Sequence, residues 1–256
     1  MITTAAERAE RDTHRDVVRA LPPAALEAGR IDVLEIAGAV CTCMSSDTSL
    51  AVWNRVIGLG IDAPPTPQIL DRIEAFYARR AAGFAVQGPV SGIEERGYTR
   101  EPGTAVFARP AQPIKPPETA LTVTDAENGQ EFGALCAAAS GLPPLFASWF
   151  AELVGRDRWH CFVARADGTP VATGALYAAA GVGSLGFAAT RQEERGQGAQ
   201  QALLAARLER ARDLGLSTVV ASTGEPVHGS PGPSYRNLER TGFQLVGVRP
   251  SWRRSP

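Results

Sequence analysis

A glycine-rich loop directly before a helix is the feature that most constrains this chain. In the stretch ERGQGAQQALLAAR (194–207), two glycines two positions apart precede a run of helix-forming residues. The segment before it, GVGSLGFAAT (181–190), is typical of a strand. At such a junction the first N–H groups of the helix lack partners, and the positive end of its dipole faces the loop. The sequence therefore predicts an anion site, with a plain tight turn as the alternative.

The loop also limits which anion it can bind. Gly196 and Gly198 let the backbone approach a phosphate or pyrophosphate closely, and Arg195 adds a positive charge. A dinucleotide fingerprint would need a third glycine where Gln201 stands, and a P-loop would need Gly-Lys-Ser/Thr, which the sequence lacks. Both of these nucleotide-binding interpretations are disfavoured.

The rest of the C-terminal half alternates regularly between apolar patterns and turn signals. We expect strand, two helices, three strands, helix, strand, helix, strand, with a hairpin turn at Asp167-Gly168. The last helix is predicted over 234–241, with Ser234 as its N-cap and Gly242 directly after it. This order predicts a mixed α/β fold. The expected ranges are 121–124, 126–139, 144–154, a hairpin over 159–177, 181–190, a helix ending at Gly215, 217–222, 234–241 and 243–252.

A proline-rich segment divides the chain. The four prolines of ARPAQPIKPPETA (108–120) fix φ and remove backbone donors, so we expect a linker at 113–118 between domains of residues 1–112 and 119–256. In the first domain we predict helices over 5–29 and 67–81 and strands within 31–44, 51–61 and 84–88.

The two halves carry one weak internal match. IEERGY (93–98) is similar to LERTGF (238–243), and each is followed by a predicted strand that ends in Arg-Pro. Such short matches also arise by chance, so the sequence leaves both duplication and coincidence open.

The loop resembles the Arg/Gln-x-x-Gly-x-Gly/Ala loop of the GNAT superfamily of N-acetyltransferases. The resemblance lies in RGQGA (195–199) and in the order of the helices and strands around it. The resemblance covers residues 119–256. It implies a mixed α+β, GNAT-like acyl-CoA N-acyltransferase fold, here in two tandem copies, with acetyl-coenzyme A as cosubstrate. The residues that it implies for the pyrophosphate are Arg195, Gly196, Gln197, Gly198, Ala199 and Gln200. Those that it implies for pairing with the pantetheine arm are Ala188, Ala189 and Thr190.

The chain departs from the family pattern in the last helix. Many members have a tyrosine four residues before the glycine of Gly-Phe, where it can protonate the departing thiolate, and this chain has Leu238. Tyr235, one helical turn earlier, or Ser234 can supply a proton instead, although Tyr235 can equally be a packing residue. Asn237 is a candidate hydrogen-bond partner for the cofactor, with an exposed amide as the alternative.

The general base is not evident from the sequence. Glu225, directly after a predicted strand, is the carboxylate that we select, and Glu193, Glu194 and His228 lie at the same end of the sheet. A solvated carboxylate, or an exposed histidine, is the favoured explanation of each, and a chain of water molecules could serve as the base instead. Phe146, Trp149 and Phe150 have the spacing of a core stripe or of an acceptor-pocket wall.

The first domain is expected to be degenerate. If the repeat is real, APPTPQ (63–68) corresponds to the pyrophosphate loop, and its three prolines offer no N–H groups.

The composition limits the kinds of partner that the chain can bind. The formal net charge is −1, which argues against nucleic acid, and no apolar run is long enough to span a membrane. The four cysteines form no metal-binding pattern, so we expect no metal and a reduced, cytoplasmic setting. The sequence thus predicts an acetyl-coenzyme A-dependent N-acetyltransferase acting on a small-molecule or peptide amine, as a monomer or homodimer. The alternative is a weak or inactive coenzyme A-binding sensor or scaffold.

Overall fold

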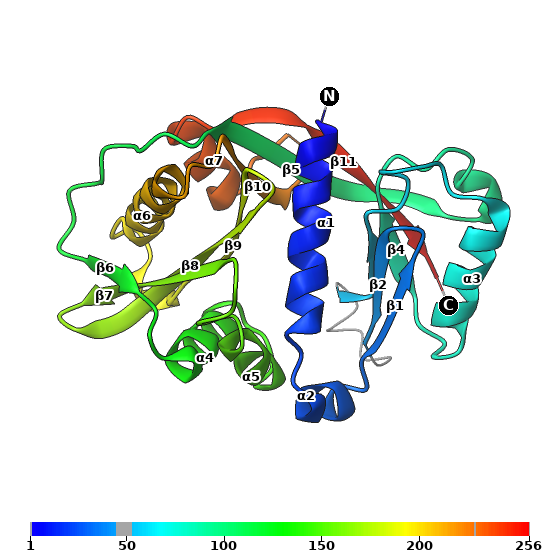
Figure 1. The fold of residues 1–256 in the computed structure, drawn as a ribbon, viewed down its shortest axis with the longest axis horizontal. Coiled ribbons are helices and arrows are strands. Elements are labelled where there is room, and N and C mark those ends of the chain that lie inside the picture. Colours follow the sequence, from blue (N-terminus) through cyan, green and yellow to red (C-terminus); the bar gives the residue numbers. More distant parts are fainter. Residues whose placement is uncertain (1, 45–52, 228, 256) are drawn as a thin grey trace.

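The computed structural model describes residues 2–44, 53–227 and 229–255, and these form one twisted sheet with helices on both faces (Figure 1). The sheet has eleven strands in the order β1-β2-β3-β4-β11-β5-β10-β9-β8-β7-β6. Within these residues no helix is both long and apolar enough to cross a membrane.

The C-terminal half confirms the predicted element order. Its hairpin turns at Asp167 and Gly168, both with positive φ, as an Asp-Gly turn between twisted strands requires. The elements are β6 (Thr122–Asp125), α4 (Gly129–Ala139), α5 (Leu145–Ala151), β7 (Trp159–Ala166), β8 (Thr169–Ala179), β9 (Val182–Thr190), α6 (Ala199–Asp213), β10 (Thr218–Gly224), α7 (Pro233–Arg240) and β11 (Gln244–Arg254).

The N-terminal half is less regular. The helix expected over 5–29 is two helices, because the Pro22-Pro23 pair interrupts helical hydrogen bonding. Of the strand-rich stretch expected over 51–61, only 55–57 is a strand, and residues 51–52 lie outside the described residues. The elements are α1 (Thr4–Arg19), α2 (Pro23–Ala28), β1 (Asp32–Ile36), β2 (Ala39–Cys43), β3 (Arg55–Ile57), α3 (Pro67–Ala78), β4 (Phe84–Gln87) and β5 (Thr99–Pro110).

The two halves share their last strands. β5 belongs to the N-terminal half in sequence, yet it lies between β10 and β11, and β11 in turn pairs with β4. Both strands run from one half of the molecule into the other (Figure 1). Each follows a glycine with left-handed φ, Gly97 or Gly242, and these two glycines stand at matching positions of IEERGY and LERTGF. The two halves are therefore joined by an exchange of strands.

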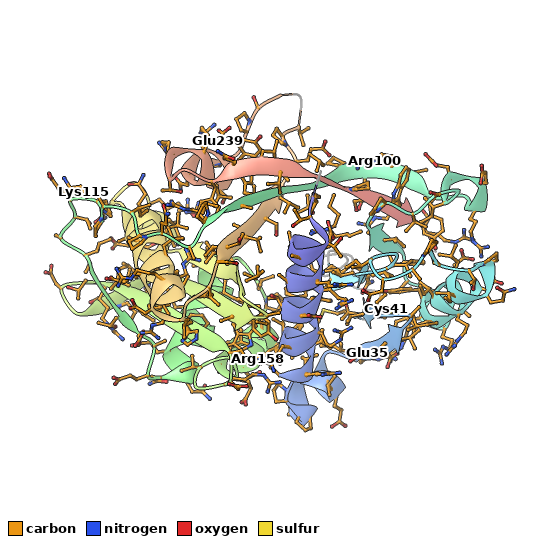
Figure 2. The ribbon with its side chains drawn as sticks, turned by 45° about the horizontal axis from the view of Figure 1, so that its top comes forward. Glu35, Cys41, Arg100, Lys115, Arg158 and Glu239 are labelled. Carbon is orange, nitrogen blue, oxygen red and sulfur yellow. The ribbon has the colours of Figure 1, made fainter. Side chains whose placement is uncertain are left out.

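The linker begins shortly after β5, which ends at Pro110. Residues 113–118 contain no helix or strand, and the segment that carries Lys115 passes α6 at one end of the molecule (Figures 1 and 2). The division of the chain into domains at this segment stays a prediction.

Alternation along the strands separates the two faces of the sheet. Ala175 and Tyr177 of β8 pack in the cluster formed with α4 and α5, whereas Leu176 packs with α6. Helix α1 lies between the two halves (Figure 1), on the face of α4 and α5, where Val17 accepts a hydrogen bond from the indole of Trp149 at 2.7 Å.

Candidate functional site

The parallel strands β9 and β10 separate halfway along β9. They pair only where Val182–Leu185 face Thr218–Ala221. Beyond Leu185, β9 contains a bulge against β8, and Phe187 in the bulge has a φ of +54°. A bulge bends a strand and re-aims its backbone groups. The separation therefore leaves the last residues of β9 with one edge that β10 does not cover.

The end of β9 presents alternate backbone groups to this open edge. Arg191 donates its N–H to Val171 of β8 at 3.0 Å, so Ala189, two residues earlier, also faces β8. The N–H and C=O groups of Ala188 and Thr190 consequently point away from β8. Ala188 is exposed, and Ala189 is buried. An extended ligand could pair with residues 188 and 190 as an added strand would.

The glycine loop has the geometry expected of an anion site. Gly196 and Gly198 have φ of +88° and +85°, in the left-handed region that favours glycine. Gly198 is the N-cap of α6, with no side chain to cap the helix. In the described part of the chain, the N–H groups of residues 196–200 have no acceptor. These groups and the exposed Arg195 side chain surround the positive end of the α6 dipole.

Two side chains fix the loop in ways that sequence reasoning missed. The amide of Gln200 donates to the hydroxyl of Thr190 at 2.9 Å and to the carbonyl of Ala189 at 3.1 Å, tying α6 to the end of β9. The hydroxyl of Thr119 donates to the carbonyl of Gln197 at 2.9 Å. The resemblance implied that Gln200 contacts the pyrophosphate and gave its side chain no role in holding the loop. A polar side chain where Gly or Ala is usual was the one available signal.

The corresponding loop of the N-terminal half has no such geometry. Helix α3 starts with Pro67, and the side chain of Thr66 caps it by accepting from Ile69 N–H at 3.4 Å. Strand β3 pairs with β4 along its full length, so these two strands do not separate. This agrees with the absence of N–H groups at Pro64 and Pro65.

Helix α7 corrects one prediction. Ser234 is not the N-cap: Gly232 is, and Pro233 occupies the first turn, where its missing N–H costs nothing. Ser234 is exposed. Leu238 is buried in the cluster of Phe107 and Phe243, so the usual tyrosine position is part of the core here.

The other two candidates of α7, Tyr235 and Asn237, are less buried than Leu238. The ring of Tyr235 meets that of Phe107 edge-on, with centroids 4.7 Å apart. It is partly buried against the same cluster. Asn237 accepts a hydrogen bond from Arg240.

Two of the three carboxylates suggested as bases already accept hydrogen bonds within the protein. Glu225 accepts from the N–H of Gly103 at 2.7 Å, which ties the end of β10 to β5. Glu194 accepts from Gln197 at 2.8 Å, and Glu193 is exposed. His228 lies outside the described residues. Glu225 stays a prediction as a catalytic residue.

The aromatic stripe of α5 is core. Phe146, Trp149 and Phe150 are at most 2 % exposed and pack together. All four cysteines are buried, and burial raises the pKa of the Cys161 thiol to about 12. Over residues 2–44, 53–227 and 229–255, no three His, Cys, Asp or Glu side chains are grouped to hold a metal ion.

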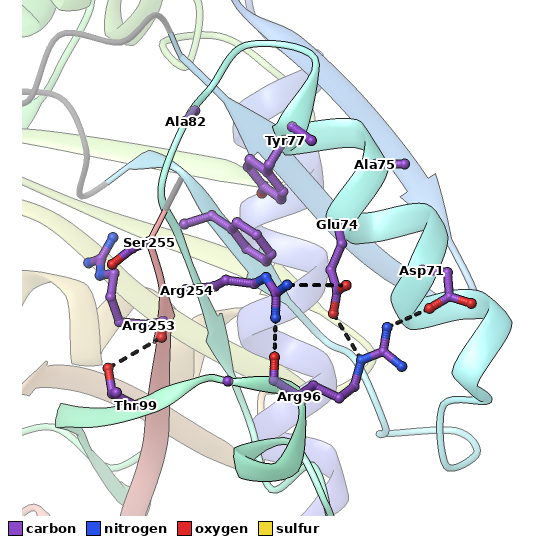
Figure 3. A pocket seen from close by; sticks show the side chains of 13 residues that line it. Asp71, Glu74, Ala75, Tyr77, Ala82, Arg96, Thr99, Arg253, Arg254 and Ser255 are labelled. Atoms are coloured by element: carbon purple, nitrogen blue, oxygen red, sulfur yellow. Dashed lines mark hydrogen bonds and ion pairs between the residues drawn. The ribbon is translucent and has the colours of Figure 1, made fainter.

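A cavity of about 640 Å³ lies elsewhere, between α3, β4 and the ends of β5 and β11 (Figure 3). Its acidic side chains are paired with arginines. Arg96 contacts Glu74 at 2.9 Å and also Asp71, and Arg254 lies 3.8 Å from Glu74. These pairs satisfy one another, so the cavity offers no free charge to a ligand.

Comparison with known protein families points to the part of the chain that contains the glycine loop and the end of β9. Residues 127–232 match the family model described as "Acetyltransferase (GNAT) family". No curated protein sequence matches the chain.

Solved structures share the whole fold. A GCN5-related N-acetyltransferase from Kribbella flavida is 19% identical, with 93% of each chain covered and a TM-score of 0.58. One from Sphaerobacter thermophilus is 17% identical, with 93% of this chain and 91% of that chain covered and a TM-score of 0.62. A tandem GNAT protein from the clavulanic acid biosynthesis pathway is 15% identical, with coverages of 87% and 81% and a TM-score of 0.57. The fold is thus one found in tandem GNAT proteins.

Proposed function

Because the chain carries an acetyltransferase domain of the GNAT family, we propose that it transfers an acetyl group from acetyl-coenzyme A to an amine. The observation that carries this proposal is the run of five unpartnered N–H groups, residues 196–200, beside the uncovered end of β9. A pyrophosphate would accept hydrogen bonds from these groups, and Arg195 would add charge.

The residues present fit such a ligand. Left-handed glycines at 196 and 198 make the loop concave toward an anion, and Gln200 holds it against β9. Ala188 and Thr190 would pair with an extended arm through their backbone groups. Bound acetyl-coenzyme A would supply the activated acetyl thioester.

The remaining chemistry falls to the chain itself. A backbone N–H near the bulge of β9 would stabilise the charge that develops on the acetyl oxygen. Tyr235, or Ser234, would deliver a proton to the leaving sulfur. Positioning of the amine would supply a large part of the rate.

A second candidate function is a coenzyme A-binding sensor or scaffold with little turnover. The buried Leu238 and the engagement of Glu225 with Gly103 favour it.

The test is release of free thiol from acetyl-coenzyme A in the presence of a panel of primary amines, with acetyl-coenzyme A binding measured by calorimetry. Binding with amine-dependent thiol release supports the enzyme. Binding of acetyl-coenzyme A without thiol release with any of the amines supports the sensor. Absence of acetyl-coenzyme A binding refutes both candidate functions.

A further inference from the structure

A buried ion cluster lies under α1, on the face of the sheet opposite α6. Glu7 and Glu10 are three residues apart on α1 and point to one side of the helix. Between them lies Arg249 of β11, which is only 1% exposed. Its Nε donates to Glu7 at 2.9 Å, and its Nη1 lies 3.3 Å from Glu10.

The cluster is not satisfied within the protein. Nη2 of Arg249 is buried and has no hydrogen-bond partner among the described residues, and the only partner of Nη1 there is the Glu10 carboxylate at 3.3 Å. Buried donors are normally paired, since an unpaired one loses its hydration without compensation. Arg55 of β3 and the ring of His14 complete the cluster, and Arg55 Nε and His14 Nε2 are also unpartnered in the described structure.

Glu10 reaches the point where β9 and β10 separate. The hydroxyl of Ser222 donates to its carboxylate at 3.0 Å. Ser222 directly follows Ala221, the last residue of β10 paired with β9, and its side chain is exposed. The carboxylate of Glu10, which is 21% exposed, therefore lies at the mouth of the separation.

Strand alternation places Glu10 opposite the cofactor side. Val220 of β10 packs against α1, whereas Val219 and Ala221 pack with α6. Ser222 shares the face of Val220. The proposed pyrophosphate loop precedes α6 on the other face, so an acceptor beside Ser222 and a thioester from the α6 side would meet between the strands.

The carboxylate of Glu10 has room for one more hydrogen-bond donor, such as the ammonium group of an acceptor substrate. A carboxylate has about four acceptor positions, and Glu10 uses one for Ser222 while Arg249 lies beside another. Glu10 can therefore still accept a hydrogen bond from an ammonium group. Glu7, Arg55 and neutral His14 are the other titratable groups around it.

We propose that Glu10, positioned by Ser222 and Arg249, binds the acceptor as a primary ammonium ion and takes its first proton. This inference rests on the proposed acetyl transfer. The ammonium R–NH3⁺ gives one proton to the Glu10 carboxylate. The free amine then forms the C–N bond, the C–S bond breaks with its electrons on sulfur, and the second amine proton ends on the thiol. The Glu10 proton returns to water.

The experiment compares Glu10→Gln, Ser222→Ala and the control Glu35→Gln, which removes a carboxylate paired with Arg15 and Arg19 at the other end of α1. Thiol release is measured with benzylamine, putrescine, glycinamide and Nα-acetyllysine across pH 6–10. We expect Glu10→Gln to lower kcat/KM for the amine about 10²-fold at pH 7, with the loss shrinking as pH rises and free amine replaces ammonium. Ser222→Ala should lower kcat/KM for the amine about tenfold or less, and Glu35→Gln should leave it unchanged.

Acetyl-coenzyme A affinity and the melting temperature of each variant separate this role from a structural one. Glu10→Asp keeps the charge beside Arg249 and should fold normally with reduced turnover if Glu10→Gln does not fold. Wild-type kcat/KM and pH profile in Glu10→Gln, in an otherwise active protein, overturn this inference alone. Failure of the wild type with every amine overturns the proposed function together with it.

Discussion

Glu7 and Arg249 are separated by 242 positions in the chain, and their side chains meet at 2.9 Å in the interior. The contact joins the first helix to the last strand. Together with the exchange of β5 and β11, it makes the first half of the chain a structural part of the proposed site in the second half.

The first prediction follows from this exchange. Residues 119–256 expressed alone lack β5, which leaves facing edges of β10 and β11 unpaired. Because exposed edges of this length promote aggregation, we expect no cooperative unfolding transition by circular dichroism and aggregation on gel filtration. Coexpression with residues 1–118 should restore a soluble complex. Cooperative unfolding of 119–256 alone would show that the boundary at 113–118 separates independent domains.

Replacing Gly198 with Val should abolish the stabilisation by acetyl-coenzyme A. The residue has a φ of +85°, and a β-branched side chain there would be strained and would crowd the anion. Gly141→Val is the matched control, since Gly141 has a φ of +67° in open space away from the loop. Both variants should lose about 1–2 kcal/mol of stability. Only the control should keep the ligand-induced shift in Tm. A normal shift in Gly198→Val would remove the loop from the site.

Replacing Tyr235 with Phe isolates the hydroxyl group. The ring contact with Phe107 is retained, so the Tm should not change. We expect turnover to fall by about 10²-fold or less and acetyl-coenzyme A affinity to stay the same, because the proton is needed only as the thiolate departs. The measurement is kcat under conditions where chemistry limits the rate. An unchanged kcat would exclude Tyr235, and Ser234→Ala then tests the other donor.

His14 should make stability depend on pH below neutrality. Burial, with the nearby Arg55 charge, holds the pKa of His14 well below 6.5, so the folded state keeps this ring neutral. The contribution of neutral His14 to the free energy of unfolding is complete above pH 6.5. It is lost as the pH falls below 6.5, because the unfolded chain then binds a proton that the folded chain does not. The slope is about 1.4 kcal/mol per pH unit. Urea unfolding between pH 6.5 and 5 should show a smaller slope in His14→Gln than in the wild type. Identical slopes would mean that other groups dominate acid destabilisation.

The proposed cofactor loop could be predicted because its signals are local. Two glycines, an arginine and a following helix lie within a few residues, and local backbone preferences fix their geometry. The N-cap of α7 was predicted wrongly because Pro233, one residue before Ser234, suits the first helical position even better.

The sequence by itself determined the order of helices and strands in the C-terminal half, since hydrophobic periodicity and turn residues act over short stretches. Only the tertiary structure decided the strand exchange of β5 and β11 and the meeting of Glu10 with Ser222. Those contacts depend on the order of strands in the sheet, which is set by the burial of whole faces against one another. The periodicity of a strand says which of its faces is buried, and not which strand lies beside it.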